Sequence, residues 1–446
     1  MAYGSFLFFV KFSWRFFSGM LVSCEYAVPA RFWHVAGLRL ACFCFFMKIL
    51  FLYSFPLWGN GSGTYIRNSV QELVRWGYKI GIVAPDDQRF LEDKIRQYRV
   101  KPPQVPVFVG HPALKGAKRY SELSEREITE IYKSYLDTTL EAIANFEPDL
   151  IHVHHLSMMT WVARYVSALY GIKYVITMHG TGLTNILLDR RYLPLSRDAV
   201  AHARAITAVS GHNRSRFLKE FGRGYAKQTY IVPGGVDMQL FPLQHKVSTA
   251  FVRKYKLKDK KMVLFSGRLT SEKGAKYVID AAKDIKGEVF LAGEGPQKKY
   301  LSELIARKGL KNVHLLGHLH PDKLVDFYYR ADVLVAPSVV DEALGLSLLE
   351  SMAASTPVVA TRKGGIPLLL KHGHNGLFVK ARNATNIATA CNRLLADDGL
   401  REKMGGNARK TVETKFTWKH AGKKLDRFYR RVVRNGKNGK NGNGKR

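Results

Sequence analysis

The chain has 446 residues, 46% of them apolar, and a formal net charge of +34. This length fits two domains of ordinary size, and the charge favours polyanionic partners: nucleic acid, an anionic membrane face or a phosphorylated substrate. The four cysteines form neither a zinc spacing nor a disulfide framework, which excludes a disulfide-rich scaffold and indicates a reducing compartment. We therefore expect a cytoplasmic globular protein, either free or peripheral on the cytoplasmic membrane face.

Residues 1–46 are rich in Phe and Trp but are interrupted by charges, so no uncharged run approaches the roughly 18 residues that a membrane span needs. A cleavable signal peptide fits poorly, because a basic start and a single apolar core do not follow in order. Lys11 and Arg15 lie among aromatic residues, which leaves a peripheral membrane-binding segment as one interpretation. We prefer another: the fold begins at Met47, and residues 1–46 are an N-terminal extension with no role in it.

From residue 47 onward, predicted strands alternate with predicted helices. Short connections with right-handed crossovers turn such an alternation into a doubly wound parallel sheet, so residues 47–238 are predicted to form a Rossmann-like domain. A glycine-rich loop, residues 59–63, follows its first strand, and residues 86–120 are predicted to be loop-like. Its strands are predicted at 49–54, 79–84, 150–154, 173–178, 205–209 and 228–232. Its helices are predicted to end at Gly77 and to span 122–145, 158–169 and 211–220.

A second alternating set follows the segment PGGVD at 233–237, which we interpret as a hinge. Residues 239–414 are predicted to form another Rossmann-like domain, and residues 415–434 a basic C-terminal helix. The basic face of that helix is interpreted either as a solvated face over a docked helix or as a membrane-surface patch. The tail 435–446 is of low complexity and is predicted to be disordered. Strands are predicted near 262–266, 288–292, 312–316, 332–336, 357–360 and 377–379. Helices are predicted near 274–286, 297–308, 321–330, 346–354, 384–396 and 398–434.

One strand-loop-helix unit, residues 333–354, carries two carboxylates. Glu342 lies in the loop and Glu350 lies inside the helix that begins at Leu346. Gly345 allows a ligand to approach the backbone at the helix start, where free amides attract phosphate. The unit therefore offers hydrogen-bond acceptors for hydroxyl groups and hydrogen-bond donors for an anion. This combination suits a sugar joined to a nucleoside diphosphate. The alternative is an ordinary βα unit with solvated acids.

The segment 266–274, SGRLTSEKG, follows the first strand of the second domain. Arg268 can bind phosphate oxygens with two hydrogen bonds, and Lys273 adds a second positive charge. Gly267 lets the backbone come near a ligand. Two basic residues in a loop are often solvated surface, but their place at a strand's carboxyl end, in the same half as Glu342 and Glu350, favours a phosphate site.

From about residue 47 to residue 433 the chain resembles family 4 of the retaining glycosyltransferases, which have the GT-B fold. The motifs that carry the resemblance are the E-x7-E pair Glu342 and Glu350, GRLxxEKG at 267–274, GEGP at 293–296, PGGVD at 233–237 and MHG at 178–180. The resemblance implies two facing Rossmann-like domains with a cleft between them.

The resemblance also implies roles for individual residues. Glu350 would hold the ribose hydroxyls and Glu342 would contact the donor sugar. Arg268 and Lys273 would bind the diphosphate and stabilise it as it leaves. In the N-terminal domain, His179 would lie beside the donor sugar, close to the reaction centre. The loop from Gly61 to Gly63 of the same domain would approach the phosphates and the acceptor. Gly267, Gly345 and Leu346 complete the predicted donor site.

The resemblance implies a retaining front-face substitution, in which the departing phosphate helps to deprotonate the acceptor hydroxyl. We expect no metal and no resident cofactor, because two cations and a helix N-terminus can stabilise a leaving diphosphate, and we assign no covalent nucleophile. Asp86-Asp87 is better explained by a surface turn than by metal binding. His152, His154 and His155 alternate at the end of a strand, and we interpret them as packed or cleft-lining rather than metal-binding.

Two departures from the family pattern concern the donor more than the reaction class. Leu368 stands where the family commonly has an acid, in Gly364-Gly365-Ile366-Pro367-Leu368. Ala343 and Leu344 stand where a glycine and an aromatic residue are frequent. The donor base and sugar therefore stay open, with UDP- and GDP-sugars as the expected classes.

We predict a transferase that moves a sugar from a nucleotide sugar to an acceptor hydroxyl. The acceptor is not identified, and a lipid-linked or cell-surface glycan would suit a basic protein at an anionic membrane. Two alternatives remain: a basic nucleic-acid or membrane-surface binding protein on a Rossmann scaffold, or a sugar-nucleotide epimerase of the GT-B fold. The motif order disfavours the epimerase, and we expect no nucleic-acid partner.

Overall fold

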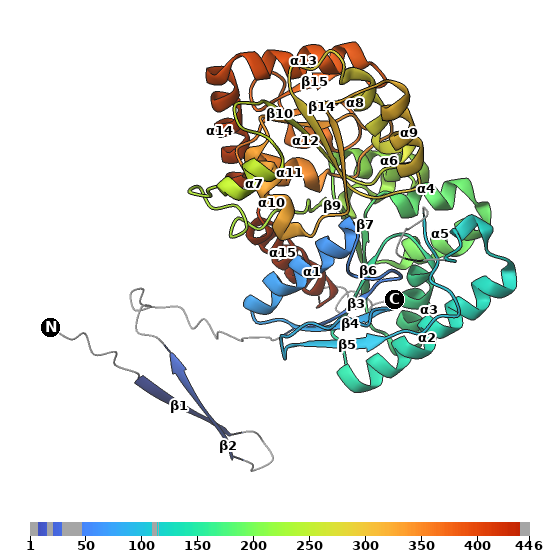
Figure 1. Cartoon of the computed structure of the whole chain (residues 1–446). Helices are drawn as coiled ribbons and strands as arrows, with labels where there is room; N and C mark the ends of the chain where they lie inside the picture. The colour runs from blue at the N-terminus through green and yellow to red at the C-terminus, as the bar shows by residue number, and fades with distance from the viewer. Residues whose placement is uncertain (1–7, 16–20, 29–46, 109–113, 115, 438–446) are drawn as a thin grey trace. The chain divides into compact units, whose positions relative to one another are not determined.

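The computed structural model describes residues 8–15, 21–28, 47–108, 114 and 116–437 (Figure 1). Within the N-terminal segment, β1 (Phe8–Arg15) pairs antiparallel with β2 (Leu21–Val28), a hairpin that the sequence did not predict. The rest of residues 1–46, and residues 438–446 of the predicted disordered tail, lie outside the described residues. The proposed absence of a role for residues 1–46 stays a prediction.

The first half of the described fold is built on a parallel sheet in the order β5-β4-β3-β6-β7-β8-β9. The chain runs outward from β3 to β5 and then returns to place β6 beside β3. This reversal is a topological switch point, where the loops after neighbouring strands diverge and leave room for a ligand. The strands are β3 (Lys48–Leu52), β4 (Lys79–Ala84), β5 (Ile95–Arg99), β6 (Leu150–His154), β7 (Tyr174–Met178), β8 (Ala205–Ala208) and β9 (Thr229–Ile231).

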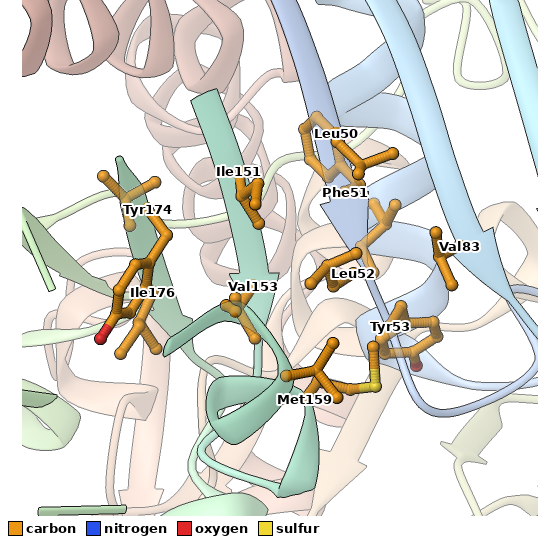
Figure 2. Packing of buried hydrophobic residues seen from close by; sticks show 14 of the residues in the cluster. Leu50, Phe51, Leu52, Tyr53, Val83, Ile151, Val153, Met159, Tyr174 and Ile176 are labelled. Carbon is orange, nitrogen blue, oxygen red and sulfur yellow. The ribbon is translucent and has the colours of Figure 1, made fainter. Parts of the chain in front are cut away.

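Apolar strand residues of this sheet are buried on both faces, as expected for a parallel sheet covered by helices. Leu50, Phe51 and Leu52 of β3 are fully buried, and Figure 2 shows them packed with Val83, Ile151 and their neighbours. The helices of this half are α1 (Gly61–Arg75), α2 (Glu125–Phe146), α3 (Met158–Tyr170), α4 (Thr181–Leu188), α5 (Leu193–His202) and α6 (Gly211–Phe221), with short 3₁₀ turns at Tyr120–Glu122, Arg190–Tyr192 and Arg223–Gln228.

The second half repeats the design on a parallel sheet in the order β12-β11-β10-β13-β14-β15. Its switch point lies between β10 and β13, so the loops after these two strands meet there. The strands are β10 (Met262–Ser266), β11 (Glu288–Ala292), β12 (Val313–Gly317), β13 (Val333–Ala336), β14 (Val358–Thr361) and β15 (Gly376–Val379). The helices are α7 (Thr249–Lys254), α8 (Ala275–Ala281), α9 (Lys298–Arg307), α10 (Pro321–Arg330), α11 (Leu346–Ala353), α12 (Ile366–Leu369), α13 (Ala384–Ala396) and α14 (Asp398–Lys415), with a 3₁₀ turn at Ser271–Lys273.

The chain crosses between the halves twice, at adjacent points. Val236 donates its amide to the carbonyl of Phe416 at 2.9 Å and forms a bridge with Thr417. After this crossing, α15 (Trp418–Lys437) returns to the first half, where it packs on α1 (Figure 1). Its apolar residues join the first core and its basic side chains remain outside. Leu425, Phe428, Tyr429 and Val432 are the buried residues of this helix in that core.

The structure confirms the predicted fold class of two doubly wound parallel sheets. Several stretches differ from prediction, among them the short helices α7 and α12, which the sequence did not predict. Residues 86–120 contain the edge strand β5, which the sequence conceals because Ile95 is the one buried residue of the strand. The stretch 180–204 holds α4 and α5. The helix predicted at 398–434 is broken at Phe416, where the backbone bonds to the crossing strand instead. Among the described helices, none combines the length and apolar character that crossing a bilayer requires.

Candidate functional site

A cleft of about 440 Å³ lies where the switch points of the two sheets face each other. Loops after β3, β6 and β7 form its near wall, and loops after β10 and β13 form its far wall. Of the ten residues predicted for the site, the structure brings eight to this cleft, and Gly63 and Glu350 do not line it. The eight are Gly61, His179, Gly267, Arg268, Lys273, Glu342, Gly345 and Leu346.

The far wall holds a half-buried ion pair. Lys273 Nζ lies 2.7 Å from Oε1 and 2.8 Å from Oε2 of Glu342, and the hydroxyl of Ser338 donates to the same carboxylate. Burial raises the pKa of Glu342, but Lys273, Ser338 and Arg268 together outweigh burial and hold the pKa below its usual value. Glu342 is therefore ionised at neutral pH and can accept hydrogen bonds from hydroxyl groups.

Arg268 contributes the second cation of the far wall. Among the residues that the structure describes, its guanidinium has no hydrogen bond and no ion pair, although burial lowers its pKa. A guanidinium stays protonated in proteins, so Arg268 offers an unpaired charge and a fork of donors to the cleft. Near it, α11 begins after Gly345, whose φ is +99° and which provides no side-chain cap. First-turn amides of a helix without such a cap are available to an anion.

Close backbone packing explains the GEGP motif at 293–296. Gly267 donates its amide to Ala292 at 3.0 Å, and Leu269 donates to Glu294 at 2.8 Å. A Cβ on Gly293, whose φ is +148°, would lie 1.8 Å from the carbonyl oxygen of Gly267. This glycine therefore lets the loop that carries Arg268 lie directly against the neighbouring loop.

Glu350 is half-buried and does not line the cleft. Its carboxylate accepts a hydrogen bond of 2.6 Å from the hydroxyl of Tyr328, which also lies 3.0 Å from the hydroxyl of Ser266, a lining residue. Burial raises the pKa of Glu350 to about 7, although the Tyr328 hydrogen bond acts in the opposite direction. Glu350 is thus connected to the cleft through Tyr328 and Ser266, whereas the sequence predicted that it would contact the ligand directly.

The near wall begins with a hydrogen-bonded loop after β3. The hydroxyl of Tyr53 lies 2.7 Å from both Oδ1 of Asn60 and Oγ of Ser62, and Asn60 caps α1 by accepting from Gly63 at 2.8 Å. A Cβ on Gly63 would lie 2.0 Å from the carbonyl oxygen of Leu57, so this glycine is required for packing. Gly61 lines the cleft, whereas Gly63 holds the loop in place.

Four histidines, His152, His154, His155 and His179, form a cluster at the near wall. His152 and His154 have ring centroids 4.3 Å apart, and those of His154 and His179 are 5.2 Å apart. Nδ1 of His154 lies 2.9 Å from Nε2 of His179. Burial lowers the pKa values of His152 and His179 to about 3, so both rings are neutral at physiological pH. His152 and His154 are packed inside, and His155 and His179 line the cleft.

The alternating histidines at the end of β6 indicated where the histidine cluster lies. The sequence did not predict which groups these histidines contact. His155 has a φ of +70°, which is uncommon for a residue with a Cβ. Its ring is 2% exposed, and its Nε2 has no hydrogen-bond partner in the described structure. Within the described residues no group of three or more His, Cys, Asp or Glu side chains is arranged to hold a metal ion.

Two known families match the chain in succession. Residues 59–240 match Glycosyltransferase Family 4, and residues 248–411 match Glycosyl transferases group 1. An uncharacterized glycosyltransferase of Methanocaldococcus jannaschii is 40% identical over 177 residues, which are 39% of this chain and 45% of that protein. The alpha-D-kanosaminyltransferase of Streptomyces kanamyceticus is 33% identical over 282 residues, which are 60% of this chain and 72% of that enzyme.

The chain belongs to the family 4, group 1 glycosyltransferases. Solved structures agree with this assignment at the level of the fold. The Anabaena protein HepE in complex with UDP-glucose superposes on this glycosyltransferase with a TM-score of 0.68 at 20% identity, covering 85% of this chain and 98% of that one. The glycosyltransferase therefore has the GT-B fold, as predicted.

Sequence reasoning missed the polar residues that support the cleft of this glycosyltransferase. Ser338 lies two residues after the end of β13 and bonds Glu342, and Asn60 is the N-cap of α1. Both positions carry local signals, because a polar residue at a strand end or before a helix has few other partners. Tyr328, which contacts Glu350, has no such local signal, since an aromatic residue in an amphipathic helix is normally predicted to be part of the hydrophobic core.

Proposed function

We propose that this glycosyltransferase is a retaining, metal-independent hexosyltransferase. It would move the sugar of a nucleoside diphosphate sugar to an acceptor hydroxyl. The observation that carries the proposal is the contrast between the walls of one cleft: an unpaired Arg268 and the Lys273–Glu342 pair stand on one side, and neutral buried histidines on the other. Such a cleft suits a ligand with an anionic end and a hydroxyl-rich end.

The far wall would bind the diphosphate. Arg268, Lys273 and the amides at the start of α11 supply positive charge and donors where the leaving group gains negative charge. Glu342 would orient Lys273 and accept hydrogen bonds from the donor sugar, because its carboxylate is ionised. HepE, which shares the fold, was solved with UDP-glucose, and this supports a nucleotide sugar as the ligand class.

Glu350 would act on the nucleoside end of the donor. Its carboxylate accepts a hydrogen bond from Tyr328, so the ribose hydroxyls would share the carboxylate with Tyr328 or displace the tyrosine hydroxyl. A carboxyl with a pKa near 7 is about half ionised at neutral pH, and hydroxyl groups that donate to it would favour its ionised form. Donor binding would therefore release protons in part from Glu350.

A front-face substitution fits the composition of the lining. Among the described lining residues, Glu342 is the one carboxylate, and it is held by Lys273. The double displacement used by retaining hydrolases needs a carboxylate placed to attack the anomeric carbon. With no second carboxylate lining the described cleft, the leaving phosphate oxygen would receive the acceptor's proton. His179 would contact the donor sugar on the near wall.

The acceptor is proposed to be a lipid-linked or cell-surface glycan, met at the cytoplasmic membrane face. The support is electrostatic. The apolar side of α15 is buried against the first core, so this helix can offer a membrane its basic side and not an apolar one. Clustered lysines and arginines bind anionic lipid weakly and in a salt-dependent way. Between Trp418 and Arg434, the exposed basic residues of the helix are Lys419, Lys423, Lys424, Arg427, Arg430, Arg431 and Arg434.

A donor screen tests the proposal. Thermal unfolding of the full chain would be measured with UDP-, GDP- and ADP-sugars, because a ligand that binds the folded form raises the midpoint. The donor that does so would then be incubated with candidate glycan acceptors in EDTA, and the anomeric configuration of the product would be read by NMR. We expect transfer with retention in EDTA. Inversion, loss of transfer in EDTA, or conversion of the nucleotide sugar without an acceptor would each contradict a part of the proposal.

A further inference from the structure

The contact between His154 and His179 joins a fully buried ring to a ring that lines the cleft. Nδ1 of His154 and Nε2 of His179 are 2.9 Å apart, a hydrogen-bond distance. A neutral imidazole carries one N–H and one bare nitrogen, so one ring must donate and the other must accept. The direction of this hydrogen bond decides which nitrogen of His179 carries the proton.

The surroundings of His154 select the direction. Its Nε2 is buried and has no hydrogen-bond partner among the described residues. Its ring packs against Phe51 at a centroid distance of 5.4 Å and against Tyr65 at 6.0 Å, so the nitrogen is enclosed by aromatic rings. A buried N–H group without a partner is rarer in proteins than a buried acceptor without one. His154 therefore keeps its proton on Nδ1 and donates it to His179.

The consequence lies on the cleft side of His179. Its Nε2 accepts from His154, so its own proton must be on Nδ1. That nitrogen is not one of the buried atoms that lack a partner, and the ring lines the cleft. Both rings are neutral, because burial lowers the pKa of each, and the neighbouring His152 and His155 are buried as well. His179 then presents an N–H donor to a ligand rather than a base.

We propose that His154 is a positioning residue that holds His179 in the Nδ1–H tautomer, so that the near wall offers a fixed hydrogen-bond donor to a hydroxyl oxygen of the bound sugar. The proposal deepens the proposed function and rests on it for the identity of the ligand. The tautomer itself is a property of the free protein. Because His179 donates rather than accepts, it does not remove the acceptor's proton, which is left to the departing phosphate.

Three substitutions at one position separate the outcomes. His154→Asn keeps a donor, because the asparagine amide can occupy the place of Nδ1–H. His154→Asp places an acceptor there, which draws the His179 proton to Nε2 and stabilises a charged ring. His154→Leu removes the hydrogen bond altogether. His202→Asn, on the exposed end of α5, is the matched control.

The first measurement uses the wild-type chain without substrate. The ring nitrogens of ¹⁵N-histidine-labelled protein report the tautomer, and the His179 signals are assigned by their loss in His179→Gln. We expect a protonated Nδ1 and a bare Nε2. Protonation of Nε2 instead would overturn the proposal whatever the enzymatic activity, and absence of any transfer activity would overturn the proposed function while leaving this result intact.

The second measurement is the pH profile of kcat. We expect His154→Asn to stay within about threefold of wild type, and His154→Leu and His154→Asp to fall by roughly 10- to 100-fold, since partners that orient a functional ring contribute at this scale. His154→Asp alone should gain a new dependence between pH 5 and 8, as the His179 pKa rises toward that range. Equal activity of the Asn and Asp variants, or an unchanged profile in the Asp variant, would contradict a tautomer role.

Discussion

The two walls of the cleft are built from the same kind of unit and carry opposite chemistry. Each wall is formed by loops at the switch point of a parallel sheet. On the far wall, Arg268, Lys273 and Glu342 are charged, and Glu342 keeps its charge because cations and a hydroxyl surround it. On the near wall, His179 and its neighbours are buried among aromatic rings and lose their charge.

The difference teaches that burial alone does not decide ionisation. Glu342 and His179 are both enclosed, but one has charged partners within hydrogen-bond distance and the other has a neutral ring. Desolvation acts against the charged form in both cases, and the partner decides the outcome. In the proposed function, a nucleotide sugar would meet cations at its phosphates and neutral donors at its sugar. Because the near wall is uncharged, it would not compete with the far wall for the phosphates.

The largest expected effect concerns the unpaired cation of the far wall. Arg268→Ala should lower kcat by about 10²- to 10³-fold, because one donor to a developing anion contributes at this scale. Steady-state kinetics with the true donor measure it. The control is Lys276→Ala on α8, which removes a lysine paired with Asp280 outside the cleft. Equal losses in both variants would show that overall positive charge, and not the wall, matters.

The next effect separates the two glycines of the near-wall loop. Gly63→Ala places a Cβ against the carbonyl of Leu57. Overpacking of this kind typically reduces the free energy of unfolding by about 1–3 kcal/mol or more, so we expect both a lower unfolding midpoint and lower activity. Gly61→Ala meets nothing closer than Leu346 Cδ1 at 3.6 Å, so it should fold normally and alter only the donor KM. Thermal unfolding and KM of the pair measure this. If Gly61→Ala unfolds as readily as Gly63→Ala, the packing argument fails.

A smaller effect is expected at Glu350. Glu350→Gln should raise the donor KM by roughly tenfold with kcat less affected, since a hydrogen bond to a charged group contributes about 1.5–3 kcal/mol. Were kcat to fall as steeply as in Arg268→Ala, Glu350 would belong with the groups that act on the leaving phosphate.

The same variant tests the raised pKa. A carboxyl with a folded-state pKa of about 7, above its ordinary 4.5, binds more protons when folded than when unfolded between these values. Its contribution to stability is therefore complete below pH 4.5 and is lost as the pH rises through 7. We expect the difference in unfolding midpoint between wild type and Glu350→Gln to change in that window, and to be level at higher pH. A flat difference from pH 4 to 8 would mean an ordinary carboxyl.

The smallest expected effect lies furthest from the cleft. The hydroxyl of Tyr429 in α15 lies 2.6 Å from Nδ1 of His152, and the His152 ring contacts the His154 ring at a centroid distance of 4.3 Å. Tyr429→Phe removes this hydrogen bond and should reduce the free energy of unfolding by about 1 kcal/mol, the usual net contribution of one buried bond. Chemical denaturation measures it. Transfer activity should change by less than in His154→Leu, and a larger loss would extend the near wall's hydrogen-bond chain to α15.

Much of the fold could be predicted from periodicity. The buried runs of β3, β10 and β13 are almost entirely apolar, and such runs predict parallel strands whatever their neighbours are, whereas β6 alternates apolar residues with histidines. The edge strand β5 could not be predicted in this way, because one of its two sides faces solvent and its residues are largely polar. The same holds for α4 and α5, whose limits depend on contacts with distant segments.

Residue type and local position determined the far wall. Arg268 and Lys273 lie in the loop after β10 and Glu342 lies in the loop after β13. The carboxyl ends of neighbouring parallel strands meet at one edge, so their grouping follows from chain order. Folding alone decided that Glu350 bonds Tyr328 and does not line the cleft, and that Gly63 serves packing, because both depend on which backbone or side chain comes near from elsewhere. The fold also makes the histidines neutral, because desolvation depends on the surroundings of a side chain and cannot be predicted from the residue alone.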